Sequence, residues 1–422
     1  MRLCVQGMRC LRASTPRIVQ LPRSSVLLRT ACATRAYSSV PPTGSSDSVT
    51  IRGQTIKTDP EWFNVPNNVL EATSRKLHLL KDHPVSITRQ IMQSNFPEPT
   101  FKYYNEFSPV VSTKQNFDSL GFPVNHPGRA LSDTYYINSE TLLRTHTSAH
   151  QADRFRGNES AGYLVSADVY RRDAIDRSHY PVFHQMEGAM SWDRTKVPNG
   201  DVAAAVWKDF EKLPVHGVKV DDPNPVMHPE RNPLQDAHHT AAEAEAIGAH
   251  LKRSLENMVV DIFSRAKATA LKEDPNFVDE PLQMRWIPDI RLFWSKDKRF
   301  LSQFEGVTDN LDKIKRFVPF SKYPPCPKDV SFWLSSTTAA GGNTKGTFHE
   351  NDVMEIVRNV AGDVVEDVRL IDEFTHPKTG RKSMAYRIVY RSLERTLTND
   401  EAVAFHEDVR QALVKELGVE LR

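Results

Sequence analysis

The polar residues that could do chemistry are concentrated between residues 168 and 188. Two adjacent arginines, Arg171 and Arg172, precede Gln185 and Glu187 in this stretch. Guanidinium groups can hold a phosphate through two parallel hydrogen bonds, and a carboxylate can pair with a primary ammonium. The stretch is therefore suited to bind a nucleotide and a small zwitterion side by side. A solvated hairpin with scattered ion pairs is the alternative interpretation, because a motif is only a hypothesis.

Two strands joined by a loop would position these residues. Val169 and Tyr170 close the first apolar run, and Val182 opens the second together with Phe183. Side chains alternate between the two faces of a strand, so the odd-numbered polar residues of the return strand project from one face. The sequence thus predicts a hairpin with Gln and Glu side by side.

Three signatures occur in a fixed order along the chain. Residues 116–136 contain N-F-D-S-L, H-P-G-R and D-T-Y-Y, residues 144–151 read R-T-H-T-S-A-H-Q, and residues 170–188 read Y-R-R-D-x-x-D-x-x-H and then F-H-Q-x-E-G. They resemble the motif 1 region, the substrate-binding signature and motif 2 of phenylalanyl-tRNA synthetases, which are class II aminoacyl-tRNA synthetases. The resemblance covers nearly everything after about residue 55 and is greatest to the single-chain mitochondrial members.

The resemblance implies an α+β/α/β architecture, with a class II antiparallel-sheet catalytic domain followed by a ferredoxin-like anticodon-binding domain. It also implies ATP-dependent attachment of phenylalanine to mitochondrial tRNA(Phe) through a phenylalanyl-adenylate. ATP and Mg²⁺ are the expected cofactors, because a hard cation binds through phosphate oxygens. The expected partners are phenylalanine and tRNA(Phe), and the expected state is a monomer in the mitochondrial matrix.

The resemblance also assigns roles to individual residues of this chain. Arg171 and His179 are the expected catalytic residues, at the α-phosphate and the outgoing phosphates. The expected ATP contacts are Arg171, Asp173, His179, Tyr180 and Phe183, the last stacking on adenine. The expected phenylalanine contacts are Ser148, Ala149, His150, Gln151, Gln185 and Glu187. No metal site is expected, since His146, His150 and His184 lack the closed set of four ligands that zinc requires.

The first 40 residues contain seven arginines and no acidic residue. Many of the others are Ser, Thr and Ala, and no unbroken apolar core follows a short basic start. This composition is typical of a mitochondrial transit peptide, which we expect to span residues 1–37. A disordered basic arm that binds RNA is the alternative.

Removal of that segment would change the charge of the protein. The whole chain has a net charge of +2, and loss of seven arginines leaves about −5. A mildly acidic protein needs local basic patches to bind tRNA.

Three of the four cysteines also lie in the segment, so Cys326 alone remains and no internal disulfide is possible. No run of 18 apolar residues is present, so no membrane span is expected.

The periodicity of the sequence predicts a flexible leader over residues 38–60 and a catalytic domain over residues 61–317. Within the catalytic domain we expect helices over residues 67–80, 84–92 and 238–267, short strands over residues 100–192, and a loop over residues 197–235. The last helix carries an apolar stripe on one face, formed by Ile247, Leu251, Leu255, Val259 and Ile262.

A proline-rich linker opens the second domain, residues 318–422. The order strand, helix, strand, strand, helix, strand predicts the ferredoxin-like arrangement. Basic residues with Tyr386 and Tyr390 between them could pair with phosphates and stack on unpaired bases. An ordinary solvated sheet face is the alternative. The expected tRNA contacts are Lys378, Arg381, Lys382, Arg387 and Arg391.

One departure from the family lies near residues 286 and 287. Members of the family carry there an F-P-F segment, a strand, and a glycine-rich motif 3 whose arginine clamps ATP. Here the segment ending at Trp286 runs directly into Ile287, and no G-x-G-x-x-R occurs in the chain. The catalytic domain would lose central strands and one side of the adenine clamp.

Three explanations for this gap are open. A mispredicted or alternatively spliced gene model would mean that the functional protein has the block. A truncated chain could still bind tRNA without charging it. A repurposed and catalytically inactive paralogue is the third possibility. We expect the chain as written to have little or no aminoacylation activity.

Overall fold

The structure is a computed structural model that describes residues 47–217, 230, 233–275, 289–314, 317–318, 323–334 and 348–422. The expected transit peptide, residues 38–46 of the expected leader, and the junction between Trp286 and Ile287 lie outside the described residues. The rest of the leader was expected to be flexible, but residues 48–57 form a paired hairpin. The division of the chain at residues 60 and 317 stays a prediction.

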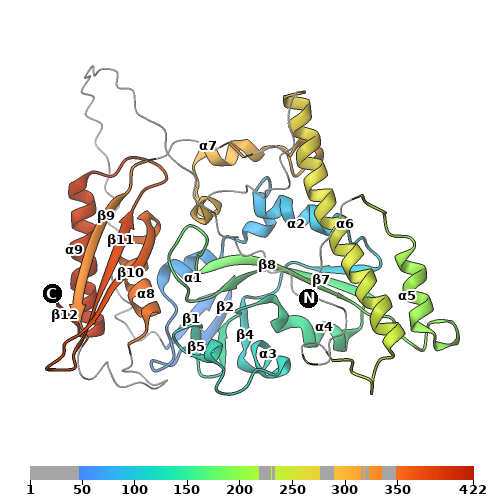
Figure 1. Cartoon of the computed structure of the whole chain (residues 1–422), viewed down its shortest axis with the longest axis horizontal. Coiled ribbons are helices and arrows are strands. Elements are labelled where there is room, and N and C mark those ends of the chain that lie inside the picture. Colours follow the sequence, from blue (N-terminus) through green and yellow to red (C-terminus); the bar gives the residue numbers. More distant parts are fainter. Residues whose placement is uncertain are drawn as a thin grey trace.

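The expected hairpin forms the centre of the molecule (Figure 1). Strand β7 (Gly162–Tyr170) pairs antiparallel with β8 (Val182–Met190), and β3 (Phe101–Tyr104) lies parallel to β7 on its other side. Every residue of β7 is buried. The hairpin predicted from the alternation of apolar and polar residues is confirmed.

A second, smaller sheet and an N-terminal hairpin pack beside this centre. The smaller sheet has the order β4 (Val110–Ser112), β6 (Thr141–Leu143), β5 (Tyr136–Asn138). The N-terminal hairpin consists of β1 (Ser48–Ile51) and β2 (Gln54–Lys57). One apolar cluster joins these parts to the ends of the central strands; it includes Ile51, Tyr135, Leu143, Tyr170, Val182 and Trp294.

Helices surround the two sheets in the described part of the catalytic domain. They are α1 (Asn67–Thr73), α2 (Pro84–Ser94), α3 (Thr113–Asn116), α4 (Gln151–Gly157), α5 (Val202–Phe210), α6 (Ala241–Glu273) and α7 (Lys298–Leu301). Helix α2 begins at Pro84, as predicted, because proline fits the first turn of a helix. In Figure 1, α5 and α6 lie at the end of the molecule opposite the C-terminal domain.

Three details of the predicted helices were wrong. The helix expected over residues 67–80 ends at Thr73 and is followed by a short 3-10 turn over Leu77–Leu79. The region expected to be a loop contains α5, which is capped by the side chain of Asp201. On α6, Ile262 is buried, whereas Leu251 is 40% exposed, so part of the expected apolar stripe is not covered by described residues.

The C-terminal domain has the element order that the sequence predicted. Its elements are β9 (Cys326–Trp333), α8 (Glu350–Ala361), β10 (Val365–Thr375), β11 (Lys382–Tyr390), α9 (Asn399–Leu417) and β12 (Glu420–Leu421). The strands form one antiparallel sheet in the order β10-β11-β9-β12. Both helices pack on one face of this sheet around a core that includes Phe332, Tyr386, Val357 and Leu413. The split strand-helix-strand arrangement is confirmed.

None of the helices in the described ranges has both the length and the apolar character needed to cross a membrane.

His83 caps helix α2 in a way that requires a neutral ring. Its Nδ1 accepts the backbone N–H of Val85 at 3.2 Å, and its Nε2 donates to the carbonyl of Phe293 at 2.9 Å. The side chain is 1% exposed. Burial lowers the pKa of His83 from 6.5 to about 4, which keeps the ring neutral at pH 7.

We expect His83 to make the protein less stable in mild acid. The unfolded chain binds a proton near pH 6.5 and the folded chain only near pH 4, so stability is lost as the pH falls below 6.5. Between pH 7 and pH 5 the loss from this residue is about 2 kcal/mol. Urea unfolding of a His83→Asn variant, which keeps a capping oxygen, should show a smaller loss over this range. An unchanged loss would rule out this assignment.

Candidate functional site

The register of the central hairpin divides its side chains between two faces. Gln185 lies opposite Ala167, and Glu187 lies opposite Val165, so these residues share one face. The face behind them carries the even-numbered residues of both strands, including Asp168. The sequence predicted that Gln185 and Glu187 would share a face, and the register confirms it.

The segment of residues 144–151 crosses the face that carries Gln185 and Glu187. The backbone N–H of Thr147 donates to Oε1 of Gln185 at 3.3 Å. The hydroxyl of Ser148 donates to Oε2 of Glu187. The structure thus brings together three residues that the sequence assigned to the amino-acid site, although they come from segments more than 30 residues apart.

Arg171 lies at the end of β7, next to the same segment. Its Nε donates to the carbonyl of Thr145 at 2.8 Å. Its guanidinium carbon is 5.2 Å from the centre of the ring of Phe183. Arg171 is half-buried rather than turned to bulk solvent. A guanidinium, a carboxylate, an amide and a hydroxyl therefore converge on one side of the hairpin.

Two of the remaining residues expected in the amino-acid site pack against other side chains of the protein. Ala149 is fully buried and packs with Val111 and Phe117, so its side chain points into the protein. The ring of His150 stacks on Phe107, with 4.3 Å between the ring centres. The side chains of Ala149 and His150 thus serve packing. Gln151 is the first residue of α4 and is half-buried.

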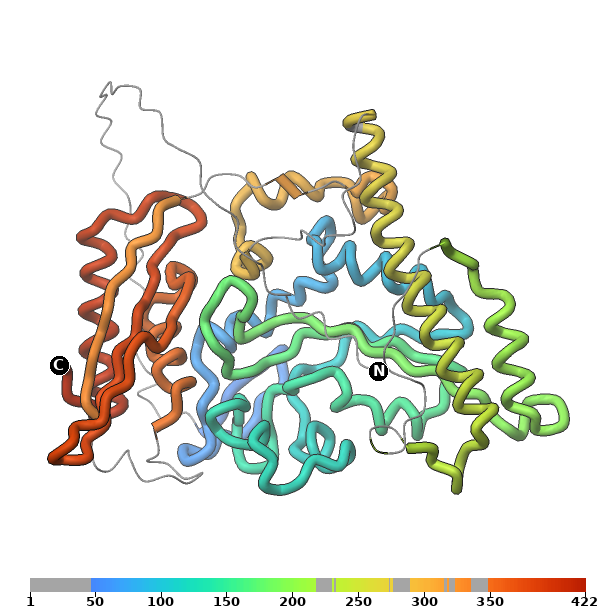
Figure 2. The backbone as a smooth tube through the Cα atoms, in the orientation of Figure 1, coloured from blue at the N-terminus to red at the C-terminus, as the bar shows by residue number. Residues whose placement is uncertain are grey.

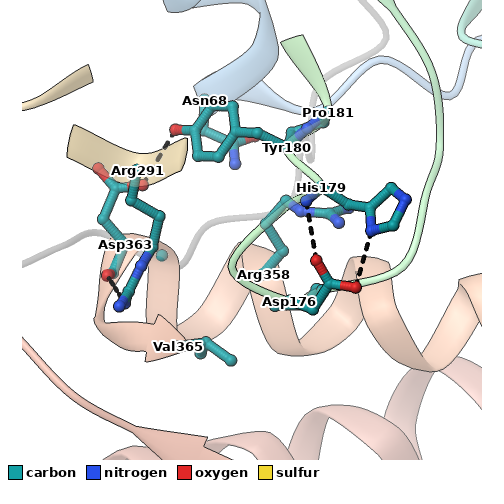
Figure 3. Close-up of a pocket in the computed structure, with 11 residues that line it drawn as sticks. Asn68, Asp176, His179, Tyr180, Pro181, Arg291, Arg358, Asp363 and Val365 are labelled. Carbon is teal, nitrogen blue, oxygen red and sulfur yellow. Dashed lines mark hydrogen bonds and ion pairs between the residues drawn. The ribbon is translucent and has the colours of Figure 1, made fainter. Parts of the chain in front are cut away.

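The loop between β7 and β8 turns toward the C-terminal domain. Tyr180 donates its hydroxyl to Asp363 at 3.0 Å and stacks on Trp294. His179 pairs with Asp176, with 2.7 Å between Nδ1 and Oδ2. Figure 3 shows His179 and Tyr180 in a pocket that also includes Arg291, Arg358 and Asp363.

Contacts with helix α8 hold the same loop in place. Arg358 donates to the carbonyl of Asp173 at 2.8 Å and pairs with Glu355. Glu355 also accepts the hydroxyl of Tyr135 at 2.7 Å. The N–H of Val368, on β10, donates to the carbonyl of Ile175. The loop that carries three expected ATP contacts is therefore packed against the C-terminal domain.

The expected tRNA contacts form ion pairs inside the C-terminal domain. Arg387 is paired with Asp329 through two bonds of 2.7 Å. The other pairs are Arg381–Glu420, Lys382–Glu373 and Arg391–Glu366. Lys378 is exposed in the turn between β10 and β11. Strands β9, β10 and β12 thus supply an acidic partner to four of these five cations.

Tyr386 and Tyr390 cannot stack on bases as expected. Both are fully buried, because their side chains point to the helix-covered face of the sheet. The open face instead carries Trp333 and Phe374, which flank Ser383 across three strands. The guanidinium groups of Arg381 and Arg422 lie 5.4 and 5.5 Å from the ring of Trp333. Neither ring was among the expected tRNA contacts.

No three His, Cys, Asp or Glu side chains in the described ranges are grouped so that they could hold a metal ion. His150 lies 3.1 Å from Nη1 of Arg144, measured to its Nε2. Burial, followed by the charge of Arg144, lowers the pKa of His150 to about 3. The ring is therefore neutral at pH 7 and accepts this hydrogen bond.

Comparisons with known proteins agree with this geometry. Residues 68–210 match the class II core domain (F) of tRNA synthetases, and residues 321–422 match the ferredoxin-fold anticodon binding domain. The chain is 40% identical over 458 residues to the mitochondrial phenylalanine–tRNA ligase of Saccharomyces cerevisiae, which covers 89% of this chain and 95% of the yeast protein. The chain belongs to the phenylalanine–tRNA ligase family.

Another relative in the family is the mitochondrial enzyme of Mus musculus. It is 34% identical over 450 residues, which covers 92% of this chain and 93% of the mouse protein. The class II core followed by the anticodon-binding domain is therefore the architecture of this chain, as the sequence predicted.

The alignments with these ligases are longer than the part of this chain that they cover. For the mouse protein, 92% of 422 residues is about 388, against 450 aligned positions, so about 60 positions have no residue of this chain. For the yeast protein, 89% is about 376 against 458, which leaves about 80. Gaps of several tens of positions agree with the absence of a block that holds an F-P-F segment, a strand and motif 3.

We expect Arg358 to anchor the loop of this ligase to helix α8. Replacement of Arg358 by Met leaves the buried carboxylate of Glu355 without its closest cation, which should lower the free energy of unfolding by about 3 kcal/mol. Urea unfolding monitored by tryptophan fluorescence measures this loss.

Arg369→Met is the matched control, because Arg369 lies in the same domain, is 61% exposed and is 3.8 Å from its acidic partner. It should change stability by less than about 0.5 kcal/mol. Equal losses in the two variants would show that the interdomain contact does not contribute as described.

Proposed function

We propose that this protein attaches phenylalanine to tRNA(Phe) in two steps, through a phenylalanyl-adenylate formed from ATP. Membership of the phenylalanine–tRNA ligase family supports this activity. The observation that carries it is the convergence of Ser148, Gln185 and Glu187 next to Arg171. The first step brings together two anions and one ammonium. Arg171 offers a cation for the anions, and Glu187 offers a carboxylate for the ammonium.

In the first step, a carboxylate oxygen of phenylalanine attacks the α-phosphorus of ATP and pyrophosphate leaves. Glu187 holds the ammonium of phenylalanine by charge, and Ser148 and Gln185 complete its hydrogen bonds. Arg171 neutralises the negative charge that develops on the α-phosphate. Phe183 stacks on adenine. Mg²⁺ would accompany ATP and would neutralise part of the charge of the triphosphate, since hard cations prefer oxygen ligands.

Asp173, His179 and Tyr180 lie farther along the loop, toward the C-terminal domain. Their proposed contacts with ATP require the triphosphate to run from Arg171 along this loop. Desolvation raises the pKa of Tyr180 well above its usual value, so its hydroxyl stays protonated and donates to Asp363.

In the second step, a ribose hydroxyl at the 3′ end of tRNA attacks the carbonyl carbon of the phenylalanyl-adenylate and AMP leaves, while the C-terminal domain holds the anticodon. Lys378, Arg381, Lys382, Arg387 and Arg391 are the proposed phosphate contacts. The open sheet face supports this role, because Trp333 and Phe374 offer rings for unpaired bases beside Arg381. Arg391 is the least accessible of the five, at 20% exposed.

We place this reaction in the mitochondrial matrix, with the protein acting as a monomer. The yeast and mouse relatives are named as mitochondrial enzymes. The arginine-rich start without acidic residues is typical of a mitochondrial transit peptide, which supports this location. One chain carries both the catalytic core and the anticodon-binding domain, which supports a single-chain enzyme.

The absent block bears on how well this chain performs the reaction. The yeast and mouse alignments support a gap of about 60 to 80 positions in this chain, and the sequence motifs suggest that it lies between Trp286 and Ile287. The block would supply the motif 3 arginine and the rings that receive phenylalanine. Loss of one charge-stabilising donor typically slows a reaction by about 100-fold to 1,000-fold.

Phenylalanine-dependent ATP–pyrophosphate exchange tests the proposed function. We expect exchange by a chain that carries the mouse block between Trp286 and Ile287, and a rate at least about 100-fold lower from the chain as it stands. Within the restored chain, Glu187→Gln removes the charge that binds the ammonium and should raise the KM for phenylalanine at least about 10-fold.

Glu140→Gln is the control for that variant, because Glu140 is an exposed acid between β5 and β6. It should leave the KM unchanged. No exchange by the restored chain would contradict the proposed function. Binding of tRNA without exchange by either chain would favour the alternative of a tRNA-binding protein.

The basic face of the C-terminal domain can be tested by charge reversal. We expect Arg381→Glu with Lys382→Glu to weaken tRNA(Phe) binding at least about 10-fold and to reduce its dependence on salt, because fewer counterions are then released. Filter binding at several salt concentrations measures both effects. Arg410→Glu on α9, the opposite side of the domain, is the control. Equal effects of the two variants would remove this face from the proposal.

A further inference from the structure

A buried carboxylate lies directly behind the proposed amino-acid site. Asp168 is on β7, on the face opposite to Gln185 and Glu187, and is 1% exposed. Burial alone would raise its pKa, but Arg144 and Arg52 lie so close that the pKa is held below its usual value. The carboxylate is therefore ionised and paired with two arginines.

Arg144 is the first residue of the segment that carries Ser148. Its Nη2 donates to Oδ1 of Asp168 at 2.5 Å, and its Nε donates to the carbonyl of the same residue at 2.6 Å. Its Nη1 lies 3.1 Å from Nε2 of His150. One fully buried guanidinium thus joins both ends of the segment from residue 144 to residue 150 and ties them to β7.

Arg52 reaches the same carboxylate from a distant part of the chain. It lies in the turn between β1 and β2, where its backbone has a positive φ of 49°. Its Nη2 donates to Oδ2 of Asp168, and its Nε donates to the carbonyl of Thr73 at 2.6 Å. Figure 2 shows the N-terminal hairpin, in blue, next to the green strands of the centre.

The two arginines also fix the segment against which His150 packs. Arg144 donates to the carbonyl of Ser108 at 2.6 Å, and Arg52 donates to that of Phe107 at 3.2 Å. Phe107 stacks on the ring of His150. Removal of Arg52 would leave Asp168 with one cation in place of two. It would also remove one of the two hydrogen bonds that hold the carbonyl of Phe107.

We propose that Arg52, Asp168 and Arg144 are positioning residues for phenylalanine binding, and that the N-terminal hairpin is part of the amino-acid site through Arg52. The network fixes the segment 144–150 so that Thr147 and Ser148 meet Gln185 and Glu187 on the other face of the sheet. This inference rests on the proposed function, because it concerns the same amino-acid site. Arg52 acts through the segment and does not contact the substrate.

The test compares Arg52→Ala with Arg265→Ala in the full chain. Arg265 is a matched control, because it is also partly buried and pairs with two acids, Asp261 and Asp312, in the helical layer. Hydrogen exchange measures the protection of the amides of residues 145–151, and calorimetric titration with L-phenylalanine measures its affinity.

We expect Arg52→Ala to speed hydrogen exchange in residues 145–151 and to raise the Kd for phenylalanine at least about 10-fold, since small displacements of binding groups are costly. Arg265→Ala should change neither quantity, even where it lowers the melting temperature equally. Arg52→Lys, which keeps the charge, should recover part of the affinity.

Two results would overturn the proposal. Unchanged exchange in residues 145–151 of Arg52→Ala would show that Arg52 does not position the segment. Faster exchange with an unchanged Kd would reduce the network to a structural role. Absence of phenylalanine binding by both the unmodified chain and the chain that carries the mouse block would instead count against the proposed function. The hydrogen-exchange data would still decide whether Arg52 fixes the segment.

Discussion

The antiparallel register between β7 and β8 is the constraint on which the rest of the structure depends. It places Gln185 and Glu187 on one face and Asp168 on the other. A shift of one residue would bring Asp168 to the same face as Gln185 and Glu187, and the separation of the two faces would be lost. The same backbone hydrogen bonds between β7 and β8 therefore position both the substrate-binding side chains and the buried carboxylate behind them.

The interface between the two domains contains buried charged side chains, as the network around Asp168 does. Arg172, Arg358 and Glu355 lie where little solvent reaches them, and each has a partner from the other domain. Ile175, from the loop of the hairpin, packs within the apolar core of the C-terminal domain. The loop that carries three proposed ATP contacts is thus held in place by the anticodon-binding domain.

Much of this arrangement could be predicted from the sequence, because local patterns determine it. Alternation predicted the hairpin, and element order predicted the C-terminal domain. The same alternation could have corrected one error: Met384, Tyr386, Ile388 and Tyr390 are spaced by two residues and so share the buried face. The helix α5 was missed, although Asp201 before a run of alanines is a helix start. Arg52 could not have been found in this way, since it lies 116 residues from Asp168 and no local pattern links them.

The position of β8 has a further consequence. Among the described strands, β8 pairs only with β7 and forms one edge of the central sheet. A nine-residue strand with an open edge offers its N–H and C=O groups to any other extended chain. In a cell, a chain whose β8 edge stays unpaired would be prone to self-association and to recognition by chaperones and proteases. Protein quality control would then limit the amount of this chain in the cell. Its contribution to aminoacylation would depend on that amount more than on its catalytic rate.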